Sequence, residues 1–168
     1  MSDARSAPPS LDGARALLRH TVATLAYRAA KAVRAAPAGF ATYAVGDTTR
    51  TPLRIIAHMA DLMDWALSIA RGQERWHDSP PLPWDAELSR FFGALTQFDE
   101  YLASDASLSE PAERLFQGPV ADALTHVGQL TMLRRLSGAP IRGENYSRAD
   151  VVVGRTGANQ TVAHREFD

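Results

Sequence analysis

Four stretches of the chain place apolar residues at the three- and four-residue spacing of a helix, and proline or glycine interrupts the chain between them. The stretches cover about residues 10–36, 51–71, 85–104 and 119–137. In the second stretch the apolar positions recur one turn apart, at Ile55, Ile56, Met63, Leu67 and Ile69. Such a stripe is typical of a helix that buries one face. The sequence therefore predicts an all-α protein with four main helices.

The predicted helix ends follow from residues that start or stop helices. Ser10 or Asp12 suits the N-cap of the first helix, and Pro52 suits the first position of the second. Gly138 and Pro140 end the fourth helix, because glycine takes the left-handed cap and proline cannot continue the helix. Before Pro119, where the fourth helix is expected to begin, residues 107–118 could add a short helical turn.

The last part of the chain, residues 138–168, is polar and lacks helical spacing. Its one β-like run, Val151–Val153, is too short to build a sheet, so we expect largely coil that lies over the helices. A chain of 168 residues with 45% hydrophobic content can bury one substantial core. The economical architecture is a single domain, residues 1–168, built as a four-helix bundle with an extended C-terminal arm.

Composition argues against several classes of function. The chain has no cysteine, so any metal must be bound by nitrogen and oxygen atoms. A net charge of -1 with scattered arginines offers no basic surface for nucleic acid. The amino terminus lacks the layout of a secretory signal, and no apolar run approaches the roughly 18 residues that span a bilayer. We expect a cytoplasmic protein without nucleic-acid or membrane partners.

Two of the predicted helices each carry a histidine that could face the other helix. His58 lies in the second helix, and His126 lies in the fourth, four residues after Asp122 and three before Gln129. Residues at these spacings share one side of a helix. Two imidazoles and a carboxylate make a minimal ligand set for a divalent metal.

Three further residues are expected to support this site. Asp61 lies one turn after His58 and could accept a hydrogen bond from the imidazole nitrogen that does not bind the metal. Trp65 is expected to line the cavity beside the metal, and Gln129 is a hydrogen-bonding helper rather than a ligand.

Each of these residues also has a simpler interpretation. A histidine on an apolar helical face can be a core residue that is hydrogen-bonded to the backbone or to tyrosine. Asp122 would lie in the first turn of its helix, where the helix dipole favours a carboxylate whatever the function. The remaining histidines lack partners at useful spacing and are most simply surface or interface residues: His20, His77 and His164.

The segments TPLRIIAHMADLMDWAL, DALTHVGQLTMLRRLSGAP and ENYSRADVVVGRTG resemble the DinB-like superfamily of metal-dependent bundle proteins, which includes thiol-dependent transferases. The resemblance covers nearly the whole chain. It implies an up-down-down-up four-helix bundle with a metal at one end of the inner cavity. The implied ligands are a histidine of the second helix and two residues four apart on the fourth, which are His58, Asp122 and His126 in this chain.

The chain departs from that family at Asp122, where members with a full ligand set usually carry histidine. A set of two histidines and one carboxylate suits zinc, nickel, iron or manganese. Aspartate is also shorter than histidine, and a carboxylate that fails to reach the metal would leave a degenerate site. Sequence alone does not decide between these alternatives.

Two functions follow from these alternatives. The first is a metal-dependent enzyme, either a thiol-dependent transferase or a hydrolase, whose small-molecule substrate the sequence does not identify. The second is a non-catalytic binding or stress-response module with a degenerate metal site. A homodimer is also expected, formed either by the alanines and valines of the first helix with Tyr27, or by the C-terminal arm, where Tyr146 and Val151–Val153 need burial.

Overall fold

The computed structural model describes the backbone of residues 11–167 and the side chains of residues 13–167. Its helices are α1 (Leu11–Val33), α2 (Pro52–Ala70), α3 (Trp84–Ala103), the short α4 (Ala112–Leu115) and α5 (Ala121–Leu136). A π-helical turn (Phe116–Val120) joins α4 to α5, and 3-10 turns cover Phe40–Thr42 and Tyr146–Arg148. Strands β1 (Gly143–Glu144) and β2 (Glu166–Phe167) pair as a small antiparallel sheet. The prediction of a mainly helical protein is confirmed.

The ends of the long helices follow from local chemistry. At the start of α2 the Thr51 hydroxyl accepts a hydrogen bond from the Arg54 N–H at 3.4 Å. The helix stops before Gly72, whose φ of 70° few other residues adopt. Helices α2 and α3 begin and end within one residue of their predicted ends. Helix α1 ends three residues early, because Ala35 takes a left-handed φ of 48°. The alternative N-cap, Ser10, lies outside the described residues.

The fourth predicted helix starts differently from the expectation. Pro119 does not begin it but lies inside the π turn. In an α-helix the proline ring would collide with the carbonyl four residues earlier, and the wider π turn relieves that collision. The Ala121 N–H bonds to the Phe116 carbonyl, five residues back. The chain is therefore helical without a break from Ala112 to Asp122, and Asp122 does not lie at a free helix end. This weakens the interpretation that the helix dipole alone explains a carboxylate at this position.

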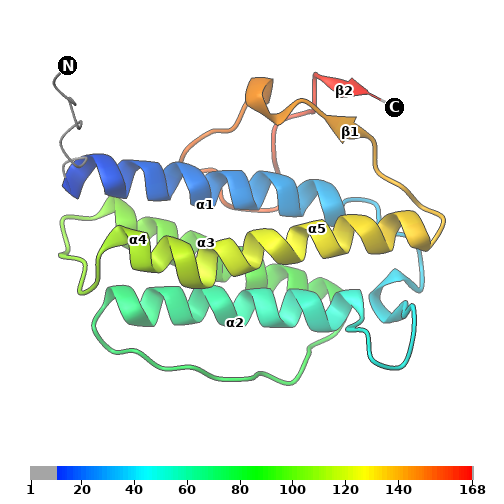
Figure 1. Cartoon of the computed structure of the whole chain (residues 1–168), viewed down its shortest axis with the longest axis horizontal. Helices are drawn as coiled ribbons and strands as arrows, with labels where there is room; N and C mark the ends of the chain where they lie inside the picture. Colours follow the sequence, from blue (N-terminus) through cyan, green and yellow to red (C-terminus); the bar gives the residue numbers. More distant parts are fainter. Residues whose placement is uncertain (1–10, 168) are drawn as a thin grey trace, which may run out of the picture.

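The four long helices pack around a shared apolar core. Figure 1 shows α1 and α5 running in one direction and α2 and α3 in the other, while the segment between α2 and α3 returns along the length of α2. Helix α2 packs against α3 and α5, and α1 packs against the same two helices. Leu17 of α1 is 66% exposed although its neighbour Leu18 is buried. The largest fully buried side chains include Phe91, Phe98, Ile56, Met59 and Met63.

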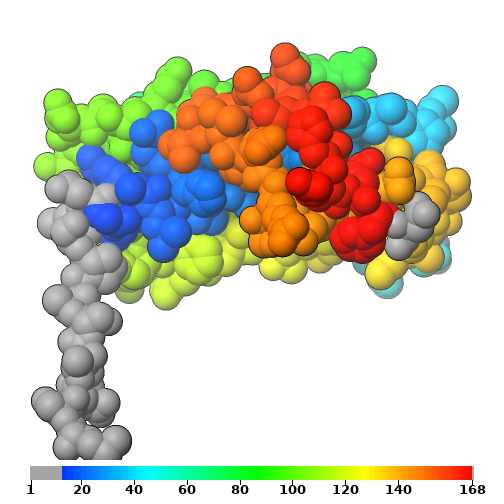
Figure 2. All heavy atoms as spheres, turned by 90° about the horizontal axis from the view of Figure 1, so that it is seen from above, coloured from blue at the N-terminus to red at the C-terminus, as the bar shows by residue number. Residues whose placement is uncertain are grey.

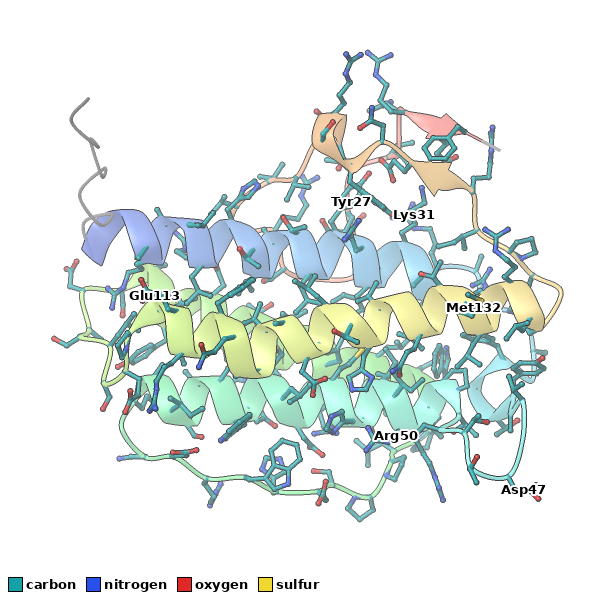
Figure 3. The ribbon with its side chains drawn as sticks, in the orientation of Figure 1. Tyr27, Lys31, Asp47, Arg50, Glu113 and Met132 are labelled. Carbon is teal, nitrogen blue, oxygen red and sulfur yellow. The ribbon has the colours of Figure 1, made fainter. Side chains whose placement is uncertain are left out.

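The C-terminal arm lies over α1 (Figures 1 and 2). The Glu144 carboxylate accepts hydrogen bonds from the Tyr27 hydroxyl at 2.6 Å and from the Lys31 ammonium at 2.8 Å. Lys31 also pairs with Glu166 at 2.8 Å, so one cation links both strands of the arm to α1 (Figure 3). The Tyr146 ring meets Tyr27 edge to face. The arm thus covers this side of the helix.

This packing corrects one expectation about interfaces and leaves another open. Tyr27 and its neighbours Val22 and Ala26 are buried within the chain, so this face of α1 is not available to a second copy. Val152 and Val153, expected to need burial, are 45% and 44% exposed. The buried polar residues of the arm are instead Glu144, Thr156 and Gln160. No helix in the described part of the chain is long and apolar enough to cross a membrane.

Candidate metal centre

Three side chains from two helices converge on one point. His58 comes from the middle of α2, and Asp122 and His126 come from adjacent turns of α5. One potential ligand atom of each residue lies within 4.8 Å of those of the other two. The Asp122 carboxylate lies between the imidazoles, with Oδ2 at 3.4 Å from His58 Nε2 and Oδ1 at 3.5 Å from His126 Nε2. This group could hold a metal ion.

The separations decide whether the short aspartate reaches far enough. A tetrahedral metal with bonds of about 2.0–2.1 Å needs neighbouring ligand atoms roughly 3.3–3.5 Å apart. Both nitrogen–oxygen distances in the group match that edge. The imidazole rings lie nearly perpendicular, with their centroids 4.9 Å apart. The Asp122 carboxylate therefore lies at such a ligand-to-ligand distance from each imidazole nitrogen, through a different oxygen for each.

Gln129 fixes the orientation of His126. His126 Nδ1 lies 2.8 Å from Gln129 Oε1, one turn further along α5. The amide oxygen can only accept, so we assign the Nδ1–H as donor. The Nε2 atom then keeps its lone pair and faces Asp122. A metal-binding histidine commonly has such a partner on its other nitrogen.

Burial and charge keep His58 neutral. Burial lowers the pKa of the His58 imidazole, and the nearby His126 and Arg50 lower it further. The Asp122 carboxylate acts in the opposite direction without restoring the usual pKa. The His58 and His126 side chains are 18% and 8% exposed, whereas Asp122 is 47% exposed. Both imidazoles are thus sheltered, and the carboxylate faces solvent. A neutral imidazole is the form that binds a metal.

Asp61 interacts with groups other than His58. Its Oδ2 accepts the Ser79 N–H at 2.9 Å, and its Oδ1 accepts from the Arg90 guanidinium at 2.7 Å. Burial alone would raise the pKa of Asp61, but the Ser79 and Arg90 contacts bring it below its usual value. Asp61 and His58 do line one hollow together. These contacts of Asp61 hold the segment before α3 against α2.

His77 has partners that the sequence analysis missed. Its Nε2 lies 3.1 Å from Asp61 Oδ1 and 3.5 Å from Asp64 Oδ2. The potential ligand atoms of these three residues also lie within 4.8 Å of one another. However, the Arg90 guanidinium approaches both carboxylates, at 2.7 Å from Asp61 and 3.7 Å from Asp64. The Arg90 guanidinium, which also pairs with the buried Glu87, already contacts both carboxylates, so we expect the cluster to take a metal less readily than the first group.

Two tryptophans lie beside the imidazoles. The Trp76 ring meets His58 edge to face at 5.6 Å and Trp65 at 5.7 Å. Trp65 donates from its indole N–H to Glu74 at 3.2 Å, and its ring faces the π turn near Gly118. Trp65 therefore supports Trp76, which in turn covers His58. Trp65 thus contacts the segment after α2 and the π turn.

Two hollows open beside the group. The first has a volume of about 410 Å³ and the second about 400 Å³. His126 and Gln129 line the first, and His58 and Asp61 line the second. Arg50, which precedes α2, lines both (Figure 3). A small molecule in either hollow would lie next to an imidazole of the group.

Sequence spacing could not reveal four residues near the group. Trp76 reaches His58, and His77 reaches Asp61, because the segment between α2 and α3 folds back along α2 (Figure 1). Arg90 reaches Asp61 across the interface between α2 and α3. Arg50 lies in a loop with no periodic pattern. The one sequence signal for Arg50 is Pro52, two residues later. It marks the start of α2 and so places Arg50 just before that helix.

Comparisons with family models, with curated proteins and with solved structures give no match for this chain.

Proposed function

We propose that the chain binds a divalent metal through His58, Asp122 and His126 and acts as a metal-dependent enzyme of the DinB-like type. The observation that carries the proposal is the convergence of two sheltered imidazoles and a carboxylate within 4.8 Å, at nitrogen–oxygen separations that suit one ion. Zinc, nickel, iron and manganese all accept such a ligand set. The up-down-down-up four-helix bundle belongs to the same proposal, and the helix directions in Figure 1 support it.

The proposed reaction is a thiol-dependent transfer or a hydrolysis on a small molecule. A metal with three protein ligands keeps a position for water or substrate and lowers the pKa of a bound water or thiol. The protein's part is to keep His126 Nε2 unprotonated through Gln129 and to shelter His58 under Trp76. The hollows beside both imidazoles give a substrate access to the site.

The alternative function is a non-catalytic binding or stress-response module with a degenerate site. The 47% exposure of the Asp122 side chain favours it, because a solvated carboxylate gives up its water at a cost when it binds an ion. The two functions differ in whether the purified protein holds metal.

Elemental analysis of purified protein tests the proposal. The wild-type chain, His58→Ala and His126→Ala are loaded with zinc, dialysed and measured together. His20→Ala serves as the matched control, because His20 is exposed on α1 and lies outside both histidine and carboxylate groups. Circular dichroism of each variant reports whether the helices persist.

We expect one metal per chain in the wild type and in His20→Ala, and less than a tenth of that in the two site variants. Asp64→Asn, in the second group, should keep the metal, since Asp64 is not one of the three proposed ligands. Metal-free wild-type protein, or metal that remains in both His58→Ala and His126→Ala, would refute the proposal and favour the non-catalytic module.

A further inference from the structure

Arg50 is a cation placed between the two hollows beside the proposed metal site. It shares the first hollow with His126 and the second with His58. No carboxylate among residues 13–167 forms an ion pair with its guanidinium. The second hollow also holds Asp61 and Asp78, whereas no acidic residue lines the first.

The charges around the first hollow favour an anionic ligand. A guanidinium stays charged at any ordinary pH, and a divalent metal bound nearby would add two more positive charges. Asp122 offsets only one of them, and Asp61 is already paired with Arg90. Positive charges gathered in a half-enclosed site repel one another unless an anion joins them. Arg50 therefore disfavours the metal alone and favours a metal site that also contains an anionic ligand.

The walls of the first hollow are mostly apolar. Ile55 and Leu133 are buried, at 2% and 7% exposure, and Met132 is 55% exposed at the mouth. Figure 3 shows Met132 on α5 and Arg50 at the start of α2. Methionine is a flexible side chain that adapts to ligands of different shape. One charged group on an apolar wall suits a ligand with an acidic end and an apolar body.

We propose that the first hollow binds a small organic carboxylate, with its carboxylate on the Arg50 guanidinium and its apolar body against Ile55, Met132 and Leu133. This inference rests on the proposed function, since it names the substrate class for that metal site. A guanidinium can donate two parallel hydrogen bonds to a carboxylate, which makes the pair strong and directional. A volume of about 410 Å³ is within the range of small-molecule sites.

Calorimetric titration with 3-phenylpropanoate tests the inference, and its neutral amide, 3-phenylpropanamide, is the control ligand. Both are titrated into metal-free and zinc-loaded protein. Arg50→Gln removes the proposed cation. Arg54→Gln is the matched control, because Arg54 is exposed, lies one turn away and does not line the first hollow.

We expect Arg50→Gln to weaken 3-phenylpropanoate binding roughly 10- to 100-fold, as for a lost charged hydrogen bond, and Arg54→Gln to leave it unchanged. The amide should bind weakly to the wild type and equally to both variants. Equal binding of acid and amide would overturn the inference, and so would equal losses in the two arginine variants.

A second pair of variants tests the apolar wall. Met132→Glu places a negative charge in the hollow, whereas Leu136→Glu places it one turn later, at a residue that is 51% exposed and outside the hollow. Binding of the acid should be lost in the first variant and kept in the second. Equal binding in both variants would contradict the position assigned to the ligand.

The design separates this inference from the proposed function. Zinc content is measured in every sample, and Arg50→Gln should keep its metal. If the wild type holds no metal, the proposed function fails, while the metal-free titration still decides whether the Arg50 hollow binds carboxylates. If metal binds but Arg50→Gln behaves as the wild type, the inference fails and the proposed function stands.

Discussion

Gln129 shows how a single residue can tune the proposed metal site without binding the ion. It holds His126 through one hydrogen bond at 2.8 Å. Removing such a partner usually costs a metal site about 10- to 100-fold in affinity. We therefore expect Gln129→Leu to lose its zinc at a chelator concentration about 10- to 100-fold lower than the wild type needs.

The control for this prediction is Gln97→Leu, the same change at an exposed position of α3. Its zinc affinity should equal that of the wild type. If Gln129→Leu also keeps the wild-type affinity, His126 does not need the hydrogen bond to act as a ligand.

Asp61 is predicted to matter for stability, because its buried carboxylate pairs with Arg90 and accepts the Ser79 N–H. Asp61→Asn would remove one charged partner of the guanidinium, which keeps its pair with Glu87, so we expect a loss of about 1.5–3 kcal/mol in the free energy of unfolding, as for one charged hydrogen bond. Urea denaturation at pH 7 measures this loss. Asp64→Asn is the matched control: burial raises the pKa of Asp64, so removing its charge should cost less.

The same carboxylate predicts an acid dependence. The folded-state pKa of Asp61 is lowered, after its Ser79 and Arg90 contacts overcome the effect of burial. The stabilisation of the folded state by the Asp61 carboxylate is therefore fully present above the unfolded pKa of about 3.9. It is lost as the pH falls through the lower folded pKa. The stability difference between wild type and Asp61→Asn should shrink below about pH 4. A difference that is the same at pH 7 and pH 3 would contradict this account.

At the scale of the element, helical spacing predicted α2 and α3 to within a residue, because their buried stripes and flanking breaks lie in the local sequence. It misplaced the start of the last helix, since Pro119 is a common first residue of helices and its place in a π turn depends on the preceding α4. Helical spacing also identified the two histidines of the candidate site, because their positions on the helices follow from the local sequence. The contacts of Asp61 with Ser79 and His77 were not identified, because these two residues come from a segment that folds back over α2.

The C-terminal arm is predicted to depend on one carboxylate. Glu144→Ala removes the acceptor of Tyr27 and one partner of Lys31, each a charged hydrogen bond that contributes about 1.5–3 kcal/mol. We expect faster hydrogen exchange of the Asn145 amide, which bonds to Arg165 between the two ends of the arm.

Glu113→Ala, at an exposed position of α4, is the control and should leave this exchange rate unchanged. Wild-type exchange in Glu144→Ala would mean that apolar contacts alone hold the arm on α1.

At the scale of the whole molecule, the expected homodimer stays a prediction, although one of its two expected surfaces, the Tyr27 face of α1, is covered. The Tyr27 face lies under the arm, whereas Leu17 is 66% and Phe116 46% exposed beside a hollow of about 700 Å³ between α1 and α4. A dimer would bury these two side chains. Sedimentation velocity should then show a dimer at micromolar concentration and a monomer for Leu17→Glu, with Val162→Glu, at 68% exposure on the arm, as the control. A wild-type monomer would rule the dimer out.

The central claim is that His58, Asp122 and His126 together bind one divalent metal. The most direct measurement is an anomalous difference map from crystals of zinc-loaded protein, collected at the zinc absorption edge. The account predicts one peak at about 2.0–2.2 Å from the Nε2 atoms of both histidines and from an Asp122 oxygen. A peak at Asp61, Asp64 and His77 instead, or no peak in protein that retains zinc, would contradict it.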